Sequence, residues 1–398
     1  MLNFKIVGCG AAGNKALANL LSIGYPSELC YFVNSTAVDI PKEYKNQSII
    51  FGASHNRLGG CGKERNIGKK MLLEDLRNNS TIIDSIVDGN EQAIVLVGST
   101  EGGSGSASIP ILAKYFNEVY KKPVIIVLFF GFKDDIRGLQ NSIEICQELS
   151  EDYTVVGIDN SSFLSEVNGN RFKAESMAND KFSLIIRILT GSLIKEGVQM
   201  IDDTDLFKIV TTPGYLIADG KTLDDRIKTA ADYEKSIKDM LLSESHFIDP
   251  PKSSACKRIG CIFNLVEIND NINYSGNIIG DIYGHPYEYF ISLADGCNTN
   301  DFFFIASGMK FPIDTIQNIY EQYKSRSESM DKSKDSFFDS IGSLRGNMDD
   351  SQFNMLGWTD KTNTRQNKSD FFGSFGISDF VDGEQKVTTS AIPDKEDY

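Results

Sequence analysis

Continuous apolar runs separated by helical patterns dominate the first 160 residues of the chain. Runs such as AIVLVG at 93–98 and VIIVLFF at 124–130 contain no alternating polar positions, which is typical of parallel strands covered by helices on both faces. We predict strands at Phe4–Gly8, Leu29–Asn34, Ser48–Phe51, Ala93–Ser99, Pro123–Phe130 and Tyr153–Asp159. Helices are predicted between them, including Ile109–Tyr120 and Leu139–Leu149. The alternation indicates an α/β fold with a doubly wound parallel sheet.

The second half has a different pattern. A long helical stretch covers Lys173–Glu196 and is predicted to stop at Gly197. A second α/β unit follows, with strands near Gly260–Val266, Tyr289–Leu293 and Phe302–Ala306 and a last helix at Pro312–Ser327. We predict four segments: a first domain at 1–172, a central helix and the loop after it at 173–206, a smaller second domain with a C-terminal helix at 207–328, and a disordered acidic tail at 329–398.

Composition excludes several classes of protein. The net charge of −15 argues against broad binding of nucleic acid, so we expect any contact with DNA to go through an adaptor. No apolar run approaches the roughly 20 residues that cross a bilayer, and no signal peptide is evident. The seven cysteines form no C-x-x-C pair, which suits a reducing cytoplasm. The three histidines share no spacing typical of metal ligands.

The first glycine-rich loop, Gly8–Gly13, follows the first strand as GCGAAG. This G-x-G-x-x-G pattern is also found in dinucleotide-binding folds, where an acidic residue about 20 positions later holds the ribose. Here the second predicted strand ends instead in Asn34-Ser35-Thr36. An NAD-dependent oxidoreductase is therefore the disfavoured interpretation.

A second glycine-rich loop, STEGGSGSAS at 99–108, follows the strand AIVLVG. Glycines let the backbone approach a ligand closely, and successive N–H groups can form a nest for anions at a helix N-terminus. The loop contains no Gly-Lys-[Ser/Thr], so it is not a Walker P-loop. We interpret it as a phosphate-binding loop of another type.

These loops, in this order, resemble those of the tubulin/FtsZ superfamily of GTPases. Its signature loop is matched by GGSGS at 102–106, the first nucleotide loop by GCGAAGN, the second by FVNSTAVDI and the third by GGCGKERNIG at 59–68. The resemblance covers most of 1–328. It implies that the bound nucleotide is GTP, with Mg²⁺ held mainly through phosphates and water.

The resemblance also implies a set of nucleotide-binding residues. Asn160 and Asn179 fall where the superfamily holds the guanine base, and Asp134 could replace a ribose-binding Glu. The full set is Gly8, Gly10, Ala11, Ala12, Asn14, Asn34, Gly60, Gly62, Lys63, Gly102, Gly103, Ser104, Gly105, Ser106, Asp134, Asn160 and Asn179.

The stretch EGVQMIDDTDL resembles the catalytic loop of the superfamily, with Asp202 and Asp205 as the implied catalytic carboxylates. At 1.5 Å per residue, the predicted central helix separates them from Asn179 by about 25–30 Å. They would then act only on a nucleotide bound by another subunit, orienting the attacking water. A head-to-tail contact of this kind generates a filament.

Several positions depart from the superfamily pattern. Glu101 stands where Gly is usual, and its carboxylate would repel phosphates unless it turns outward or helps hold Mg²⁺ through water. Lys63 or Arg65 could neutralise the γ-phosphate, or both could be surface residues. Met200 replaces Asn in the catalytic loop, and Arg137 lies one place from the expected Arg.

The helix predicted after the last strand resembles the plasmid and phage tubulins of TubZ and PhuZ type. This implies a cytoplasmic homopolymer that positions or segregates plasmid or phage DNA through an adaptor, with the tail contacting a neighbouring subunit or a partner. Two tail segments, DSFFDSIG and SDFFGSFGISDF, are either short binding motifs or a coincidence of composition. The alternatives are an FtsZ-like cell-division protein and a superfamily member that hydrolyses little GTP and acts as a regulator.

Overall fold

The computed structural model describes residues 1–52, 59–79, 83–149, 152–224, 229–243 and 245–325. Residues 1–321 form one compact unit. The predicted tail at 329–398, with its two Phe-containing segments, lies outside the described residues. The predicted boundaries at 172 and 206 stay a prediction.

One sheet runs through the described residues, with the strand order β3-β2-β1-β4-β5-β6-β7-β10-β8-β9. The strands from β3 to β7 pair in parallel, and β10 pairs antiparallel with both β7 and β8. The strands are β1 (Phe4–Cys9), β2 (Cys30–Asn34), β3 (Ser48–Ile50), β4 (Ala93–Ser99), β5 (Val124–Phe130), β6 (Thr154–Asp159), β7 (Gly214–Thr222), β8 (Arg258–Asn264), β9 (Glu288–Ala294) and β10 (Asp301–Met309). The predicted α/β class and its parallel strands are confirmed.

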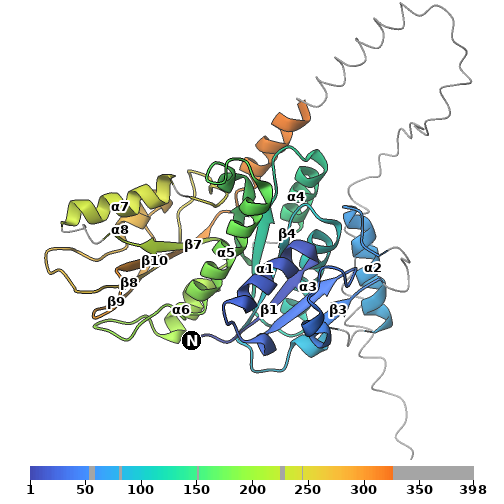
Figure 1. Ribbon diagram of the computed structural model, residues 1–398, viewed down its shortest axis with the longest axis horizontal. Helices are drawn as coiled ribbons and strands as arrows, with labels where there is room; N and C mark the ends of the chain where they lie inside the picture. The colour runs from blue at the N-terminus through green and yellow to red at the C-terminus, as the bar shows by residue number, and fades with distance from the viewer. Residues whose placement is uncertain (53–58, 80–82, 150–151, 225–228, 244, 326–398) are drawn as a thin grey trace, which may run out of the picture. The chain divides into compact units, whose positions relative to one another are not determined.

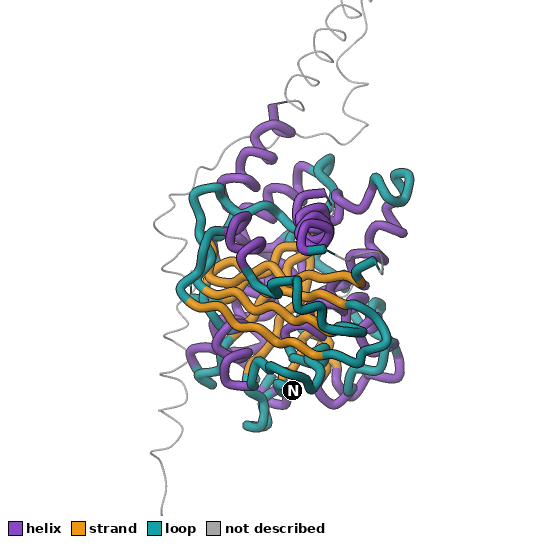
Figure 2. Tube along the Cα trace, turned by 90° about the vertical axis from the view of Figure 1, so that its left-hand side faces the viewer, coloured by secondary structure: helices purple, strands orange, loops and turns teal. Residues whose placement is uncertain are grey.

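Helices cover this sheet on both faces, as Figure 2 shows. They are α1 (Gly10–Ser22), α2 (Arg65–Asn78), α3 (Gly103–Glu118), α4 (Ile136–Glu148), α5 (Arg171–Leu189), α6 (Asp203–Val210), α7 (Ala230–Ser243) and α8 (Asn277–Tyr283), with short 3-10 turns such as η5 (Asn160–Leu164). α1 and α5 lie side by side in Figure 1 and are in contact, and α3 contacts α2 and α4. Strand β5 is buried along its whole length, which explains its continuous apolar run.

The central helix is shorter than its sequence pattern predicts. α5 ends at Leu189, not at Glu196, because Gly191 turns the chain with a φ of 76°. The amide of Asn264 then donates to the carbonyl of Leu193 at 2.8 Å, a tertiary bond in place of a helical one. Gly197 is not a helix cap: a Cβ there would overlap Ala294 of β9, so only glycine lets the loop lie on the sheet.

The helix after β4 is longer than its pattern predicts. α3 begins at Gly103, not near Ile109, so the glycine-rich stretch forms its first turns. Strand β7 and helices α6, α7 and α8 were not among the predicted elements. The last predicted helix is present at residues 313–325, directly after Pro312. No helix among the described residues combines the length and apolar character needed to span a membrane.

Candidate functional site

The two glycine-rich loops meet backbone to backbone at the carboxyl ends of β1 and β4, which pair in parallel up to Cys9 and Gly98. Gly10 has a φ of 70°, and a Cβ on it would lie 2.6 Å from the backbone nitrogen of Gly105. A Cβ on Gly105 would in turn lie 2.6 Å from the carbonyl oxygen of Cys9. These glycines let the first turns of α1 and α3 lie against each other, so that two helix N-termini share one edge of the sheet.

The second and third predicted loops join the same edge through serine and cysteine side chains. The hydroxyls of Ser35 and Ser104 are 2.6 Å apart, and Ser104 Oγ donates to Cys61 Sγ at 3.5 Å. Asn34 turns its side chain inward, where Oδ1 accepts from the N–H of Ser35 at 2.9 Å. The four loops that the sequence singled out are therefore brought together.

Asn14 lies behind the first loop and is fully buried. Neither polar atom of its side chain has a hydrogen-bond partner among the described residues. A Cβ on Gly8 would lie 2.8 Å from Asn14 Oδ1, so that glycine makes room for the amide. An unsatisfied buried amide is unusual and marks a position that a ligand or water can satisfy.

A cavity of about 180 Å³ opens beside these loops. Four residues predicted from the sequence line it: Ala11 and Ala12 from the first loop, Asn160 after β6, and Asn179 on α5. Asn160 Oδ1 is buried without a hydrogen-bond partner among the described residues. An amide that is free to bond, in a cavity that the first turn of α1 also lines, suits a ligand with a polar ring at one end and an anion at the other.

The cavity wall also contains residues that the sequence reasoning did not assign to binding. These include Lys15, Phe132, Glu175 and Glu101. Only Glu101 had been singled out, as a departure from the superfamily pattern. The spacing of Glu175 and Asn179, four positions apart on α5, is a signal that could have indicated Glu175.

The third loop is shaped by a run of left-handed residues. Gly59, Gly60 and Gly62 have positive φ, and so does Lys63 at 64°. The amide of Asn141 fixes this conformation by donating to the carbonyls of Lys63 at 2.9 Å and of Glu101 at 2.8 Å. The ammonium of Lys63 is half-exposed and forms an ion pair with Asp135, whose hydrogen bond raises the pKa of Lys63.

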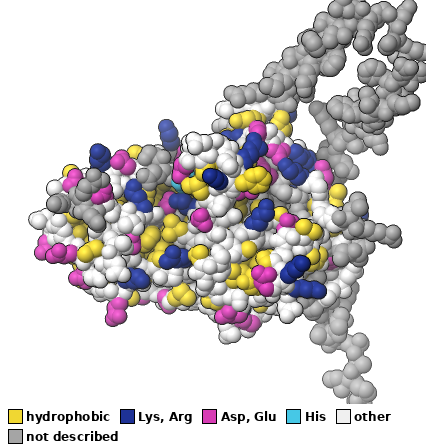
Figure 3. Space-filling model, viewed as in Figure 1, with side chains coloured by type: hydrophobic (Ala, Val, Ile, Leu, Met, Phe, Trp, Pro, Cys, Tyr) yellow, Lys and Arg dark blue, Asp and Glu magenta, His cyan; other side chains and the backbone are white. Residues whose placement is uncertain are grey.

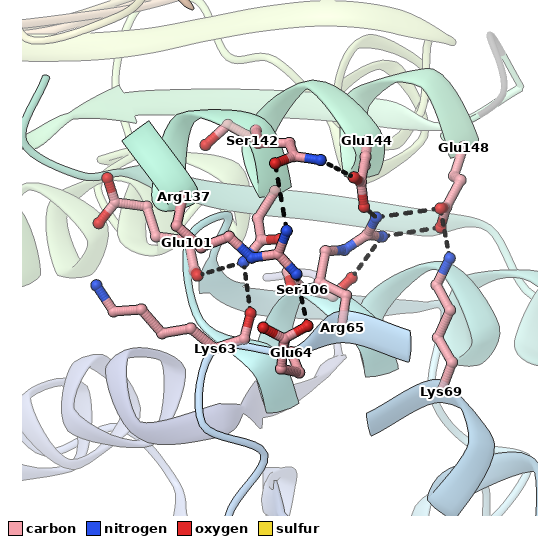
Figure 4. Close-up of polar contacts among 12 residues, drawn as sticks. Lys63, Glu64, Arg65, Lys69, Glu101, Ser106, Arg137, Ser142, Glu144 and Glu148 are labelled. Atoms are coloured by element: carbon pink, nitrogen blue, oxygen red, sulfur yellow. Dashed lines mark hydrogen bonds and ion pairs between the residues drawn. The ribbon is translucent and has the colours of Figure 1, made fainter. Parts of the chain in front are cut away.

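Arg65 is one of the two basic residues considered for the γ-phosphate, and its charge is already used inside the protein. Its side chain is 2% exposed, and its guanidinium bonds Glu144 at 3.1 Å and Glu148 at 2.9 Å on α4, as Figure 4 shows. It also donates to the carbonyl of Ser106 at 3.1 Å. That carbonyl lacks a helical donor because residue 110 is proline. Arg65 is therefore a structural residue that joins α2, α3 and α4.

The charged side chains of the predicted ribose-binding stretch are not among the described residues that line the cavity. Asp134 is exposed and forms an ion pair with Arg171, and Arg137 bonds Glu64 at 2.6 Å. Among the described residues, the carboxylates that line the cavity are those of Glu101 and Glu175. Burial, followed by the nearby negative charge of Asp135, raises the pKa of Glu101 to about 7.

The predicted catalytic carboxylates lie at the start of α6. Asp202 caps this helix and accepts from the N–H of Asp205 at 2.7 Å. Asp203, between them, accepts from the amino group of Met1 at 3.1 Å. Met1 precedes the amino end of β1, whereas the glycine-rich loops lie at the carboxyl ends of β1 and its parallel neighbour β4. Because six strand residues span about 20 Å, Asp202 and Asp205 lie far from the cavity of their own chain.

The first part of the chain is similar to a known family of GTPase domains. The sequence profile of the tubulin/FtsZ family GTPase domain matches residues 3–168. Cell division protein FtsZ 2 of Methanocaldococcus jannaschii is 26% identical over 211 residues, which are 52% of this chain and 54% of the relative. This chain therefore spans about half the length of that curated relative.

Two solved structures have the same fold at low sequence identity. The TubZ of Clostridium botulinum phage c-st superposes with a TM-score of 0.62 and 17% identity, covering 82% of this chain and 98% of that one. A GTPγS-form protofilament of TubZ from Bacillus thuringiensis serovar israelensis gives a TM-score of 0.67 and 15% identity, covering 85% of this chain and 94% of that one.

Proposed function

We propose, from the tubulin/FtsZ-family GTPase domain that residues 3–168 form, that this chain binds and hydrolyses GTP and assembles head to tail into filaments. The observation that carries the proposal is the separation of two halves of a site. The glycine-rich nucleotide loops lie at the carboxyl ends of β1 and β4, and Asp202 and Asp205 lie beyond the amino end of β1. Neither half is complete for hydrolysis within one chain.

In this proposal GTP spans the cavity and the glycine-rich loops. Its phosphates accept hydrogen bonds from the backbone N–H groups at the starts of α1 and α3, where both helix dipoles favour negative charge. The guanine base is held between Asn160 and Asn179. The described residues contain no cluster of three or more metal-ligating side chains, so Mg²⁺ would be held by the phosphates and water and would neutralise their charge.

Hydrolysis then needs a second subunit whose α6 covers the γ-phosphate of the first. The carboxylate of Asp202 accepts from the backbone N–H of Asp205, so α6 arrives with the carboxylate of Asp202 fixed in position. Asp205, half-buried at the helix start, orients and polarises the attacking water. Since the contact joins unlike surfaces of identical chains, it repeats without closing and gives a filament. Turnover is thereby coupled to assembly.

The finer role that we propose is to position or segregate plasmid or phage DNA in the cytoplasm. The helix at residues 313–325 that follows β10 supports the TubZ-like branch, as do the TubZ folds among the similar structures. Binding of DNA through an adaptor suits the net charge of −15. In the face drawn in Figure 3, the described basic side chains are interspersed with acidic ones. The similarity to FtsZ 2 keeps a cell-division role as the second candidate.

The test is GTP turnover as a function of protein concentration, measured together with pelleting of polymer. We expect phosphate release per chain to rise with concentration and to reach a plateau as polymer forms. Asp205→Asn should polymerise with GTP yet release little phosphate. Asp203→Asn is the matched control, because it removes the neighbouring carboxylate but not the catalytic ones. GTP binding without polymer or concentration dependence would instead support a regulator that hydrolyses little GTP.

A further inference from the structure

Glu101 occupies a slot that two glycines leave open. Its carboxylate lies against the backbone of Gly131, where a Cβ would overlap it, and against Gly138, where a Cβ would lie 2.8 Å from its carboxyl carbon. Figure 4 shows its side chain extending to the same side as that of Lys63 and away from Arg65. The loop after β5 and the first turn of α4 therefore accommodate this carboxylate at the cavity wall, so it is not an exposed side chain that happens to lie nearby.

One oxygen of this carboxylate is ready for a ligand. Glu101 Oε1 is buried and has no hydrogen-bond partner among the described residues. Burying a carboxylate oxygen costs free energy unless a hydrogen-bond donor reaches it. Glu101 also directly precedes the phosphate loop at Gly102 and shares the cavity with Asn160 and Asn179. It therefore lies between the positions proposed for the phosphates and for the base, where the sugar of a nucleotide must pass.

The other candidates for contact with the sugar are less well placed. Asp134, which the sequence pattern favoured, is exposed and bonded to Arg171. Asp135 accepts from the N–H of Gly138 at 3.0 Å and pairs with Lys63. Among the described residues that line the cavity, Glu175 is the other carboxylate. It lies on α5, whereas Glu101 lies on the loop that also carries the phosphate site.

We propose that Glu101 accepts a hydrogen bond from a ribose hydroxyl and so makes this site selective for ribonucleotides over deoxyribonucleotides. The inference rests on the proposed function, since it assigns a role within the GTP site. A site that bonds a hydroxyl rejects an analogue lacking it, because the buried acceptor is then left unpaired. Glu101 in this role is a binding residue for specificity and takes no part in the reaction at the phosphate.

The experiment measures dissociation constants of GTP, 2′-deoxy-GTP and 3′-deoxy-GTP with Mg²⁺ on the full chain. The wild type should bind GTP about 10- to 100-fold more tightly than at least one of the deoxy analogues. Glu101→Gln should lose most of that preference by weakening GTP while keeping its affinity for that analogue. The retained affinity also shows that the variant is folded. Glu118→Gln on α3 makes the same chemical change outside the cavity and should keep the wild-type preference.

Several results would overturn the assignment. One is a preference that survives in Glu101→Gln, or that is lost instead in Asp134→Asn or Glu175→Gln. Another is an equal loss of affinity for GTP and for both deoxy analogues in Glu101→Gln, if raising the Mg²⁺ concentration restores that affinity. This result would assign the carboxylate to the metal. In each case the wild type still binds GTP and the proposed function stands. A wild type that binds no guanine nucleotide would overturn both proposals.

Discussion

The carboxylate of Asp203 accepts a hydrogen bond from the amino group of Met1 at 3.1 Å, and this bond joins the start of α6 to the amino end of β1. The N–H of Leu2 reinforces the junction by donating to the carbonyl of Thr190, just after α5, at 2.9 Å. Gly10 begins α1 at the opposite end of the same strand. A single strand therefore separates the predicted catalytic loop from the predicted nucleotide loops.

Gly102 offers a way to block the nucleotide without disturbing the fold. A Cβ there would meet nothing within 4 Å, and its φ of −74° suits any residue. We expect Gly102→Asp to weaken GTP binding by at least about 100-fold, because a carboxylate in the phosphate loop repels the ligand. Gly102→Ala should bind GTP normally. Equal affinities for the two variants in a titration would place the phosphates elsewhere.

The contact between Gly10 and Gly105 should be sensitive to a single methyl group. Gly10→Ala forces a Cβ to within 2.6 Å of a backbone nitrogen and should lower the free energy of unfolding by about 1–3 kcal/mol. Gly24→Ala is the control, because it has a similarly positive φ of 93° but no atom within 4 Å. Urea unfolding of the two variants separates the effect of close packing from the effect of a positive φ. If Gly24→Ala costs as much as Gly10→Ala, backbone conformation rather than close packing explains the loss.

The buried guanidinium of Arg65 should be important for stability. Arg65→Met removes the bonds to Glu144, Glu148 and the carbonyl of Ser106, and we expect a loss of about 3–5 kcal/mol, as is found when one partner of a buried ion pair is removed. Lys114→Met on α3 breaks an exposed pair and should cost less than about 1 kcal/mol. The denaturant midpoints of the two variants, measured against the wild type, give both losses of stability. A loss as small as that of the control would contradict a structural role for Arg65.

The stability of the nucleotide-free chain should fall as pH rises from about 4.5 to about 7. Burial raises the pKa of Glu101 from 4.5 to about 7, so in that interval the folded chain holds a proton that the unfolded chain has lost. Asp135 and Asp134 favour this retention, and Lys63 and Arg171 oppose it. Glu101→Gln should therefore stabilise the chain by about 1–3 kcal/mol at pH 8 and by little at pH 4. Urea melts at both pH values check this; a constant difference would contradict it.

Much of the nucleotide-binding half of the fold could be predicted from local patterns. Continuous apolar runs identify β4 and β5 because both faces of these strands are buried. The glycine-rich loops follow β1 and β4, which are parallel neighbours, and so had to meet at one edge of the sheet. The end of α5 was predicted too late because Gly191, a local helix-stop signal, was overlooked. The bond that then holds Leu193 was not predictable, because its amide comes from Asn264, 71 positions away.

In the candidate site, too, some residues could be predicted from local motifs and others could not. Ala11, Ala12, Asn160 and Asn179 reach the cavity as the motifs indicated. The inward orientation of Glu101 depends on distant glycines and could not be predicted from its own loop.

The structural role of Arg65 could not be predicted from local patterns either. It depends on a proline that frees a carbonyl on another helix. Interactions between elements that are far apart in the sequence account for both differences.

The central claim is that one chain supplies the nucleotide and the next supplies the aspartates, and mixing two inactive variants tests it most directly. Asp205→Asn keeps the nucleotide loops, and Gly102→Asp keeps Asp205. Each alone should release almost no phosphate from GTP. An equimolar mixture should recover up to about a quarter of the wild-type turnover per chain, the share of random head-to-tail contacts with both halves intact. A mixture that copolymerises yet stays as inactive as its components would contradict a site shared between subunits.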